Sequence, residues 1–141
     1  MKNIYLLDTN IISQVINPQP DEKLLSNIEL HTGICCISSI TWYELQKSIA
    51  PLPENQKKDK LFSFINDYVQ SSFPVIPYDI HAASINADIS SKLSSLGQSA
   101  PVLITQIVSI AIANNLILVT DKKKDFDLFS QNFNLMVEEW N

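Results

Sequence analysis

The sequence has no arginine and little positive charge of any kind. Its ten basic residues are all lysines, and 15 acidic residues bring the net charge to −5. This balance argues against broad non-specific binding of nucleic acid, because lysine and arginine are the residues that neutralise phosphates. The lysines nevertheless form two local clusters that could provide a basic rim, Lys57-Lys58-Lys60 and Lys122-Lys123-Lys124.

Cysteine, glycine and long hydrophobic runs are also scarce. The chain has two glycines and two cysteines, and the adjacent Cys35 and Cys36 should point to opposite faces of a strand. We therefore expect no disulfide, but two small buried side chains in a reducing compartment. No apolar run approaches the roughly 18 residues that span a bilayer, and the first residues lack a signal-peptide core. A soluble, cytoplasmic protein with no membrane segment is expected.

Short apolar runs alternate with helical patterns along the 141 residues. Strands are expected at residues 4–7, 34–38, 73–77, 116–119 and 135–137. The expected helices run from Thr9 to a break at Pro18, from Asp21, through Trp42 to Pro51, over 54–69, from Ile80 to a cap at Gly97, and over 102–113. The last helix is apolar at nearly every position and should be buried on most of its circumference. The sequence predicts a single α/β domain over residues 1–141, with a short, mainly parallel central sheet and helices on both faces.

Acidic residues follow three of the apolar runs. Asp8 comes directly after residues 4–7, Glu44 lies behind 34–38, and Asp121 follows 116–119 with Asp125 in the same loop. The carboxyl ends of parallel strands meet at one edge of a sheet, so we expect these carboxylates to share one pocket. Acidic pockets of this kind hold divalent cations.

Each of these acids also has a local explanation. Asp8 is a favourable N-cap for the helix that follows it. Thr41 and Glu44 match a capping box, in which each side chain satisfies the other residue's backbone amide. Asp121 and Asp125 lie in a lysine-rich turn, where a solvated charge is the ordinary state. Taken one at a time, the motifs therefore leave two explanations of these acids open, a local role as a helix cap or solvated charge and a shared metal pocket.

Taken together, the motifs resemble a PIN-domain protein, and more narrowly a VapC-type toxin of a bacterial toxin–antitoxin pair. The resemblance covers essentially the whole chain and rests on Leu6-Leu7-Asp8-Thr9-Asn10, Ile40-Thr41-Trp42-Tyr43-Glu44-Leu45, the helix 107–113, Leu118-Val119-Thr120-Asp121, Asp125-Phe126 and Val137-Glu138-Glu139-Trp140. It implies an endoribonuclease dependent on Mg²⁺ or Mn²⁺ that cleaves structured RNA, typically transfer RNA. It also implies a homodimer and a VapB-type antitoxin that holds the enzyme inactive.

The resemblance further implies roles for individual residues. Asp8 would be the central metal ligand, and Glu44 a second ligand reached directly or through water. Asp121, as a third metal ligand, and Asp125 would supply the acids that follow the strand 116–119, and either could be the fourth acid. The cluster Lys122-Lys123-Lys124 would contact RNA.

One position departs from the pattern of the family. The resemblance leads us to expect a further aspartate seven residues after Gly97, where this chain has Ile104. Loss of that carboxylate predicts weak metal binding and weak or absent cleavage. It also supports an alternative, a catalytically inactive PIN-fold module that binds an antitoxin or RNA. A phosphoacceptor domain of flavodoxin-like topology is a third possibility, disfavoured because only Asp8 ends the first strand and only serines follow Ile37.

Overall fold

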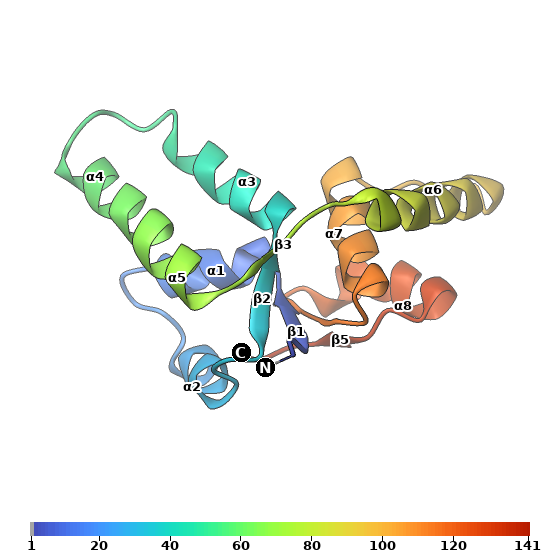
Figure 1. Ribbon diagram of the computed structural model, residues 1–141, viewed down its shortest axis with the longest axis horizontal. Helices are drawn as coiled ribbons and strands as arrows, with labels where there is room; N and C mark the ends of the chain where they lie inside the picture. The colour runs from blue at the N-terminus through green and yellow to red at the C-terminus, as the bar shows by residue number, and fades with distance from the viewer. Residues whose placement is uncertain (1) are drawn as a thin grey trace.

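The strand β1 (Tyr5–Leu7) is the centre of a five-stranded sheet. The computed structural model describes residues 2–141, in which the strand order is β3-β2-β1-β4-β5 and every neighbouring pair is parallel (Figure 1). The remaining strands are β2 (Cys35–Ser38), β3 (Val75–Ile76), β4 (Ile117–Val119) and β5 (Val137–Glu138). The expected parallel α/β fold is confirmed. The order differs from the 2-1-3-4-5 order of flavodoxin-like domains, so the phosphoacceptor alternative is not supported.

Helices cover both faces of this sheet (Figure 1). One face carries α1 (Thr9–Ile16), α2 (Glu22–Leu30), α3 (Ser39–Ile49), α4 (Gln56–Ser63), the π-helical turn η1 (Phe64–Val69) and α5 (Gln70–Ser72). The other face carries α6 (Ile80–Ser95), α7 (Val102–Ala113) and α8 (Asp127–Phe133), with the 3-10 turn η2 (Lys123–Phe126) before α8. No helix in residues 2–141 is long and apolar enough to cross a membrane.

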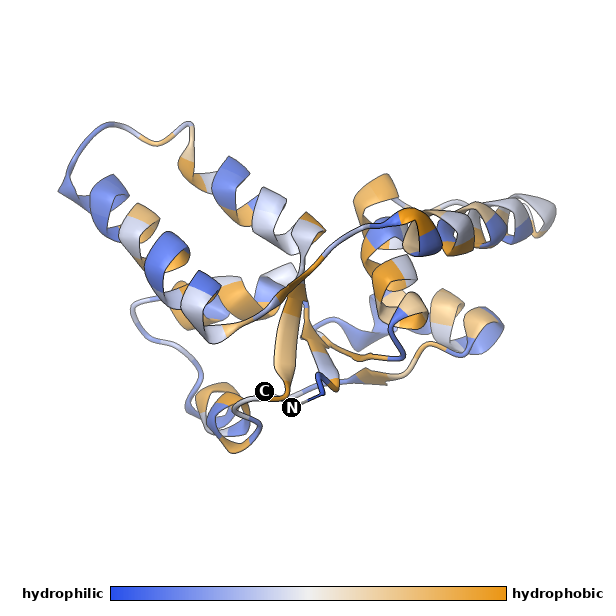
Figure 2. Cartoon of the chain, viewed as in Figure 1, coloured by the Kyte–Doolittle hydropathy of each residue, from blue (hydrophilic) through white to orange (hydrophobic). Residues whose placement is uncertain are grey.

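Side chains of the central strands alternate between two hydrophobic cores. Leu6 faces the core formed with α6, α7 and α8, whereas Leu7 faces the core formed with α1, α2, α3 and η1. Leu118 and Val119 of β4 divide in the same way. Both faces of these strands are covered, which explains why they are apolar at successive positions (Figure 2).

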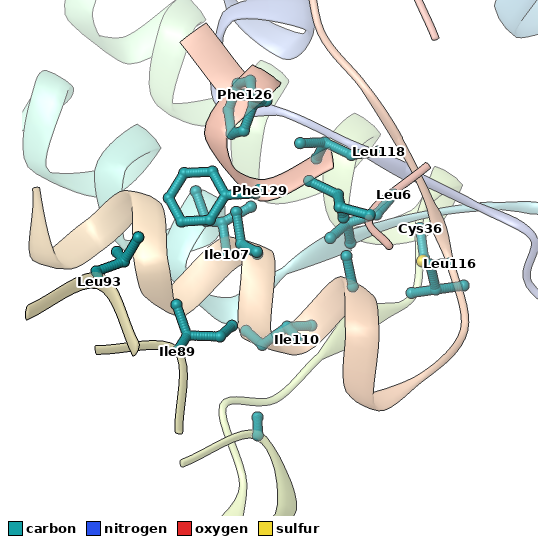
Figure 3. Packing of buried hydrophobic residues seen from close by; sticks show 14 residues of the cluster. Leu6, Cys36, Ile89, Leu93, Ile107, Ile110, Leu116, Leu118, Phe126 and Phe129 are labelled. Carbon is teal, nitrogen blue, oxygen red and sulfur yellow. The ribbon is translucent and has the colours of Figure 1, made fainter. Parts of the chain in front are cut away.

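The helix α7 is buried over most of its length, as expected. Its buried residues run from Thr105 to Ala111, except for the half-buried Gln106. Figure 3 shows Ile107 and Ile110 packed in the core beside Phe129 of α8. The first turn is more open, since the Val102 side chain is 68 % exposed. The N-terminal end of α7 therefore reaches from the core to the surface.

Smaller expectations are also confirmed. Gly97 adopts a positive φ of 68° after α6, and the amides of Gly97 and Gln98 donate to the carbonyls of Ser94 and Leu93. These two bonds form a Schellman cap, which needs the left-handed conformation that glycine adopts easily. Cys35 and Cys36 are free and buried, and burial raises their pKa values to about 11 and about 12. Both thiols are therefore protonated at neutral pH.

Several elements differ from the sequence-based expectation, and the strand expected over 73–77 comprises only Val75–Ile76. The helix expected over 54–69 starts at Gln56 and changes to π-helical pairing at Phe64. The Asn66 side-chain amide donates to the Phe62 carbonyl at 2.9 Å, which is the acceptor that the backbone amide of residue 66 would use in an α-helix. The helix α8 was not expected, although Phe129 and Phe133 have helical spacing on the core side. The last strand begins at residue 137 rather than 135.

The topology brings three chain segments together at the carboxyl edge of the sheet. From β1, the chain proceeds to β2 and β3 on one side and to β4 and β5 on the other. Such a switch point in a parallel sheet leaves a crevice outside the strand ends. Asp8 lies there, between the end of β2 and the loop after β4.

Candidate metal and RNA site

Asp8 joins the sheet, the helix α1 and the cavity at the strand ends. Its backbone amide donates to the Val119 carbonyl at 2.9 Å, which fixes the residue at the end of β1. Oδ1 accepts from the Thr9 amide at 2.8 Å, so Asp8 caps α1 as its local sequence predicted. Oδ2 accepts from the Thr120 hydroxyl at 3.0 Å. Capping and cavity lining are thus both functions of the same side chain.

Burial perturbs the Asp8 carboxyl. The side chain is 4 % exposed, and this desolvation raises the pKa of Asp8 above its ordinary value of 3.8. The charges of Glu44 and Asp121 raise the pKa further, whereas the hydrogen bonds from Thr9 and Thr120 lower it. A positive charge in the cavity would therefore stabilise the ionised form of the Asp8 carboxyl.

Glu44 lies in the second turn of α3 and reaches the same cavity. The capping-box expectation for this residue is wrong, because the Ser38 hydroxyl accepts the cap bond from the Thr41 amide at 2.9 Å. The Thr9 hydroxyl donates to Glu44 Oε1 at 2.7 Å, and the buried Thr41 hydroxyl lies 3.0 Å from that of Thr9. Because the Thr9 hydroxyl donates its hydrogen to Glu44, the Thr41 hydroxyl must donate to Thr9. The two hydroxyls form a chain that orients the Glu44 carboxylate.

A cavity of about 260 Å³ lies between these segments. Three acidic residues line it, Asp8, Glu44 and Asp125, and the remaining lining residues are Thr9, Asn10, Ile104, Lys122 and Phe126. Ile104 is half-buried in the first turn of α7 and packs against the core on that side of the sheet. The position at which the family pattern has an aspartate is therefore part of the cavity wall.

The other acid after β4, Asp121, is not among the residues that line the cavity. Asp121 is half-buried, and its two carboxylate oxygens accept hydrogen bonds from the side-chain amides of Asn10 and Gln14. Lys122 lines the cavity, whereas Lys123 and Lys124 are exposed beside it. The structure thus brings Asp125 and Lys122 to the cavity and leaves Asp121 outside its lining.

The donor set fits a hard divalent cation, although loosely. In the part of the chain that the structure describes, no three His, Cys, Asp or Glu side chains are close enough to form a ready-made ion site. Mg²⁺ prefers oxygen ligands and is commonly held by one or two carboxylates with water in the other positions. Asp8 and Glu44 provide that minimum, and Ile104 presents carbon where another oxygen donor could lie.

Sequence reasoning missed the hydroxyl and amide side chains that hold these acids. Thr9, Thr41 and Thr120 each bond to a cavity carboxylate or to the side chain next to it. The one available signal was the position of Thr9 and Asn10 directly after Asp8. Nothing in the local pattern indicates that Thr9 bonds to a residue 35 positions away.

The buried charge of Asp8 gives a pH-dependent prediction for the metal-free protein. Because its pKa is raised in the folded state, Asp8 contributes stability that is fully present below the unfolded pKa of about 3.9 and lost as pH rises through the folded pKa. The variant Asp8→Asn removes this loss, so in EDTA it should be more stable than the native chain at pH 7 and less pH-dependent above pH 4. Urea unfolding of both proteins between pH 4 and pH 7 measures this difference in stability. The exposed Asp88→Asn is the control, and a less stable Asp8→Asn protein at pH 7 would contradict the prediction.

Comparison with known proteins finds a family profile and several relatives that match most of the chain. The sequence profile of the PIN domain matches residues 5–131. Ribonuclease VapC2 of Rickettsia felis is 31 % identical over 139 residues, covering 97 % of this chain and 98 % of the relative. Toxin FitB of Neisseria gonorrhoeae is 30 % identical over 118 residues, covering 82 % and 85 %.

Solved structures agree with these matches. The structure of VapBC2 from Rickettsia felis bound to a promoter DNA fragment matches with a TM-score of 0.81 at 30 % identity, covering 98 % of this chain and 99 % of that chain. DNA-bound VapBC from Salmonella typhimurium matches with a TM-score of 0.84 at 24 % identity and covers 99 % of both chains, which supports the fold.

Proposed function

The chain belongs to the PIN-domain family and is related to the VapC and FitB ribonuclease toxins, and on this premise we propose that it is the toxin of a type II toxin–antitoxin pair. Its activity is endonucleolytic cleavage of RNA in the cytoplasm, with transfer RNA as the expected substrate, and residues 1–141 act as one domain. The observation that carries the proposal is the cavity at the carboxyl edge of the sheet, which Asp8, Glu44 and Asp125 line.

Asp8 and Glu44 would hold Mg²⁺ or Mn²⁺, with Asp125 as the third cavity acid. A divalent ion bound there supplies an activated water and stabilises the leaving oxygen of the phosphodiester. The protein's own contribution is orientation, because Thr9 holds Glu44 and Thr120 holds Asp8 at the cavity wall. Lys122 at the cavity, with Lys123 and Lys124 beside it, would bind the RNA phosphates.

Ile104 limits this activity. Its branched alkyl group lies in the cavity wall and supplies neither charge nor a lone pair to a cation. The native chain should therefore bind metal weakly and cleave slowly. The same residue favours the second candidate function, a catalytically inactive PIN-fold module that binds an antitoxin or RNA without cleavage.

The proposed partners are a VapB-type antitoxin and a second copy of the chain. Complexes named VapBC2 and FitAcB are among the structural relatives. The helix α3 leaves little apolar surface for a partner, because Leu45 is buried in the core and Trp42 is half-buried. Tyr43 remains 49 % exposed, and Val102 of α7 is 68 % exposed. A hollow of about 550 Å³ between α1 and α4, lined by Ile16, Leu61 and Phe64, offers an antitoxin a further apolar contact.

Incubation of the purified protein with transfer RNA tests the nuclease proposal. We expect slow cleavage in Mn²⁺ and none in EDTA. The variant Asp8→Asn should lower the rate by at least about a hundredfold, because it removes a charged ligand at the centre of the site. Equal cleavage by the native chain and this variant would point to a contaminating nuclease. An absence of cleavage by both the native chain and Ile104→Asp would contradict the proposal and favour the binding module.

A further inference from the structure

Asp121 is held by two amides from one face of α1. Asn10 Nδ2 donates to Oδ1 at 2.8 Å, and Gln14 Nε2 donates to Oδ2 at 2.6 Å. Asn10 and Gln14 are four residues apart, so their side chains lie on the same side of the helix. Both carboxylate oxygens are therefore engaged by charge-assisted hydrogen bonds. These two bonds attach the Asp121 side chain directly to α1.

The contacts around Asp121 extend in both directions. Gln14 Oε1 accepts from the Asn141 side-chain amide at 2.9 Å, so both ends of the Gln14 side-chain amide are hydrogen-bonded. The next residue, Lys122, donates its backbone amide to the Thr120 hydroxyl at 3.2 Å, and that hydroxyl donates to Asp8. The loop that starts at Asp121 is thus attached to α1 and to the central acid.

The same loop carries three residues that line the cavity, Lys122, Asp125 and Phe126. Asp121 itself is not among the lining residues. We propose that Asp121 is a positioning residue that clamps the start of this loop to Asn10 and Gln14, so that Asp125 and Lys122 face the cavity. The inference rests on the proposed function in one respect, since it takes the cavity to be the metal and RNA site.

Exchanging the clamp partners separates a positioning residue from a ligand. The single variant Asp121→Asn places a side-chain amide against the amide nitrogens of Asn10 and Gln14. The new NH₂ group then lies against one of these two donors, and that hydrogen bond is lost. The double variant Gln14→Glu with Asp121→Asn restores a donor and an acceptor at every contact, with the carboxylate now on α1. Asp127→Asn is the matched control, because it removes the same charge from an exposed residue a few positions further on.

NMR measures two quantities for each variant, the position of the loop and the affinity for Mg²⁺. In EDTA, the amide resonances of residues 122–126 report the position of the loop. With added Mg²⁺, shifts of the Thr9 and Phe126 amides give the affinity even when binding is weak. We expect Asp121→Asn to move the loop resonances and to weaken Mg²⁺ binding by about tenfold or more. The double variant should return the loop resonances to their native positions and the affinity to within about threefold of native.

The possible failures are distinct. A double variant that binds Mg²⁺ as weakly as Asp121→Asn, with its loop resonances restored, would show that Asp121 is a ligand and overturn the inference. Loop resonances that do not move in Asp121→Asn would also overturn it, since no clamp would then exist. If no variant, including the native chain, shows a Mg²⁺-dependent shift, the proposed metal site fails, and the loop resonances in EDTA still decide whether Asp121 positions the loop.

Discussion

Replacing Ile104 with aspartate is expected to raise Mn²⁺-dependent RNA cleavage by orders of magnitude. The residue lines the same cavity as Asp8, Glu44 and Asp125, so a carboxylate there would add a hard oxygen donor to that site. Position 104 is also in the first turn of α7, where the helix dipole favours negative charge. A bound metal stabilises the transition state by several kcal/mol, and each ~1.36 kcal/mol of this stabilisation raises the rate about tenfold.

Calorimetry with Mn²⁺ and a transfer-RNA cleavage assay on the native chain and Ile104→Asp measure this effect. Ile104→Asn is the first control, because asparagine has nearly the shape of aspartate without its charge, and this variant should cleave as slowly as the native chain. Val102→Asp is the second, since it adds the same charge to an exposed residue of the same helix turn. Expression of Ile104→Asp without the antitoxin should also arrest growth of the host. Equal metal affinity and equal activity in the native chain and Ile104→Asp would show that residue 104 is ordinary helix core.

The largest effect on stability is expected from Phe126→Ala. Phe126 is 2 % exposed at the end of η2, and its ring lies 6.3 Å from that of Phe129 in the core around α7 (Figure 3). Truncation of a buried phenylalanine removes apolar contacts and leaves a cavity, which costs about 3–5 kcal/mol of unfolding free energy. The same change releases the loop that carries Asp125, so metal affinity should fall as well.

Phe62→Ala provides the matched control, because the Phe62 side chain on α4 is 53 % exposed. The free energy of unfolding should fall by about 1 kcal/mol or less in Phe62→Ala, much less than in Phe126→Ala. Urea unfolding in EDTA compares the two variants without any contribution from bound metal. Similar losses for both would mean that the ring of Phe126 does not anchor the loop to the core.

The sequence by itself determined the fold class and the edge of the sheet at which the candidate site lies. Leu6 and Leu7 are both apolar because each packs in a different core, and this double burial produces the continuous runs that predict a parallel sheet. The position of Asp8 follows from the same pattern, because a residue directly after a central strand must lie at the carboxyl edge of the sheet. Gly97 could likewise be recognised from its place at the end of a helical pattern. Each of these signals depends on neighbours within a few residues.

Only the tertiary structure decided which acids belong to the cavity. Glu44 matches a capping box locally, yet its carboxylate accepts from Thr9, 35 residues earlier. Asp121 and Asp125 occupy the same polar turn, and contact with Asn10, 111 residues away, separates the first from the cavity. A carboxylate satisfies a backbone amide, a hydroxyl or a cation equally well, so residue type and spacing cannot select among these partners. That selection comes from the packing of α1 against α3 and the β4 loop, which sets the distances between groups far apart in the chain.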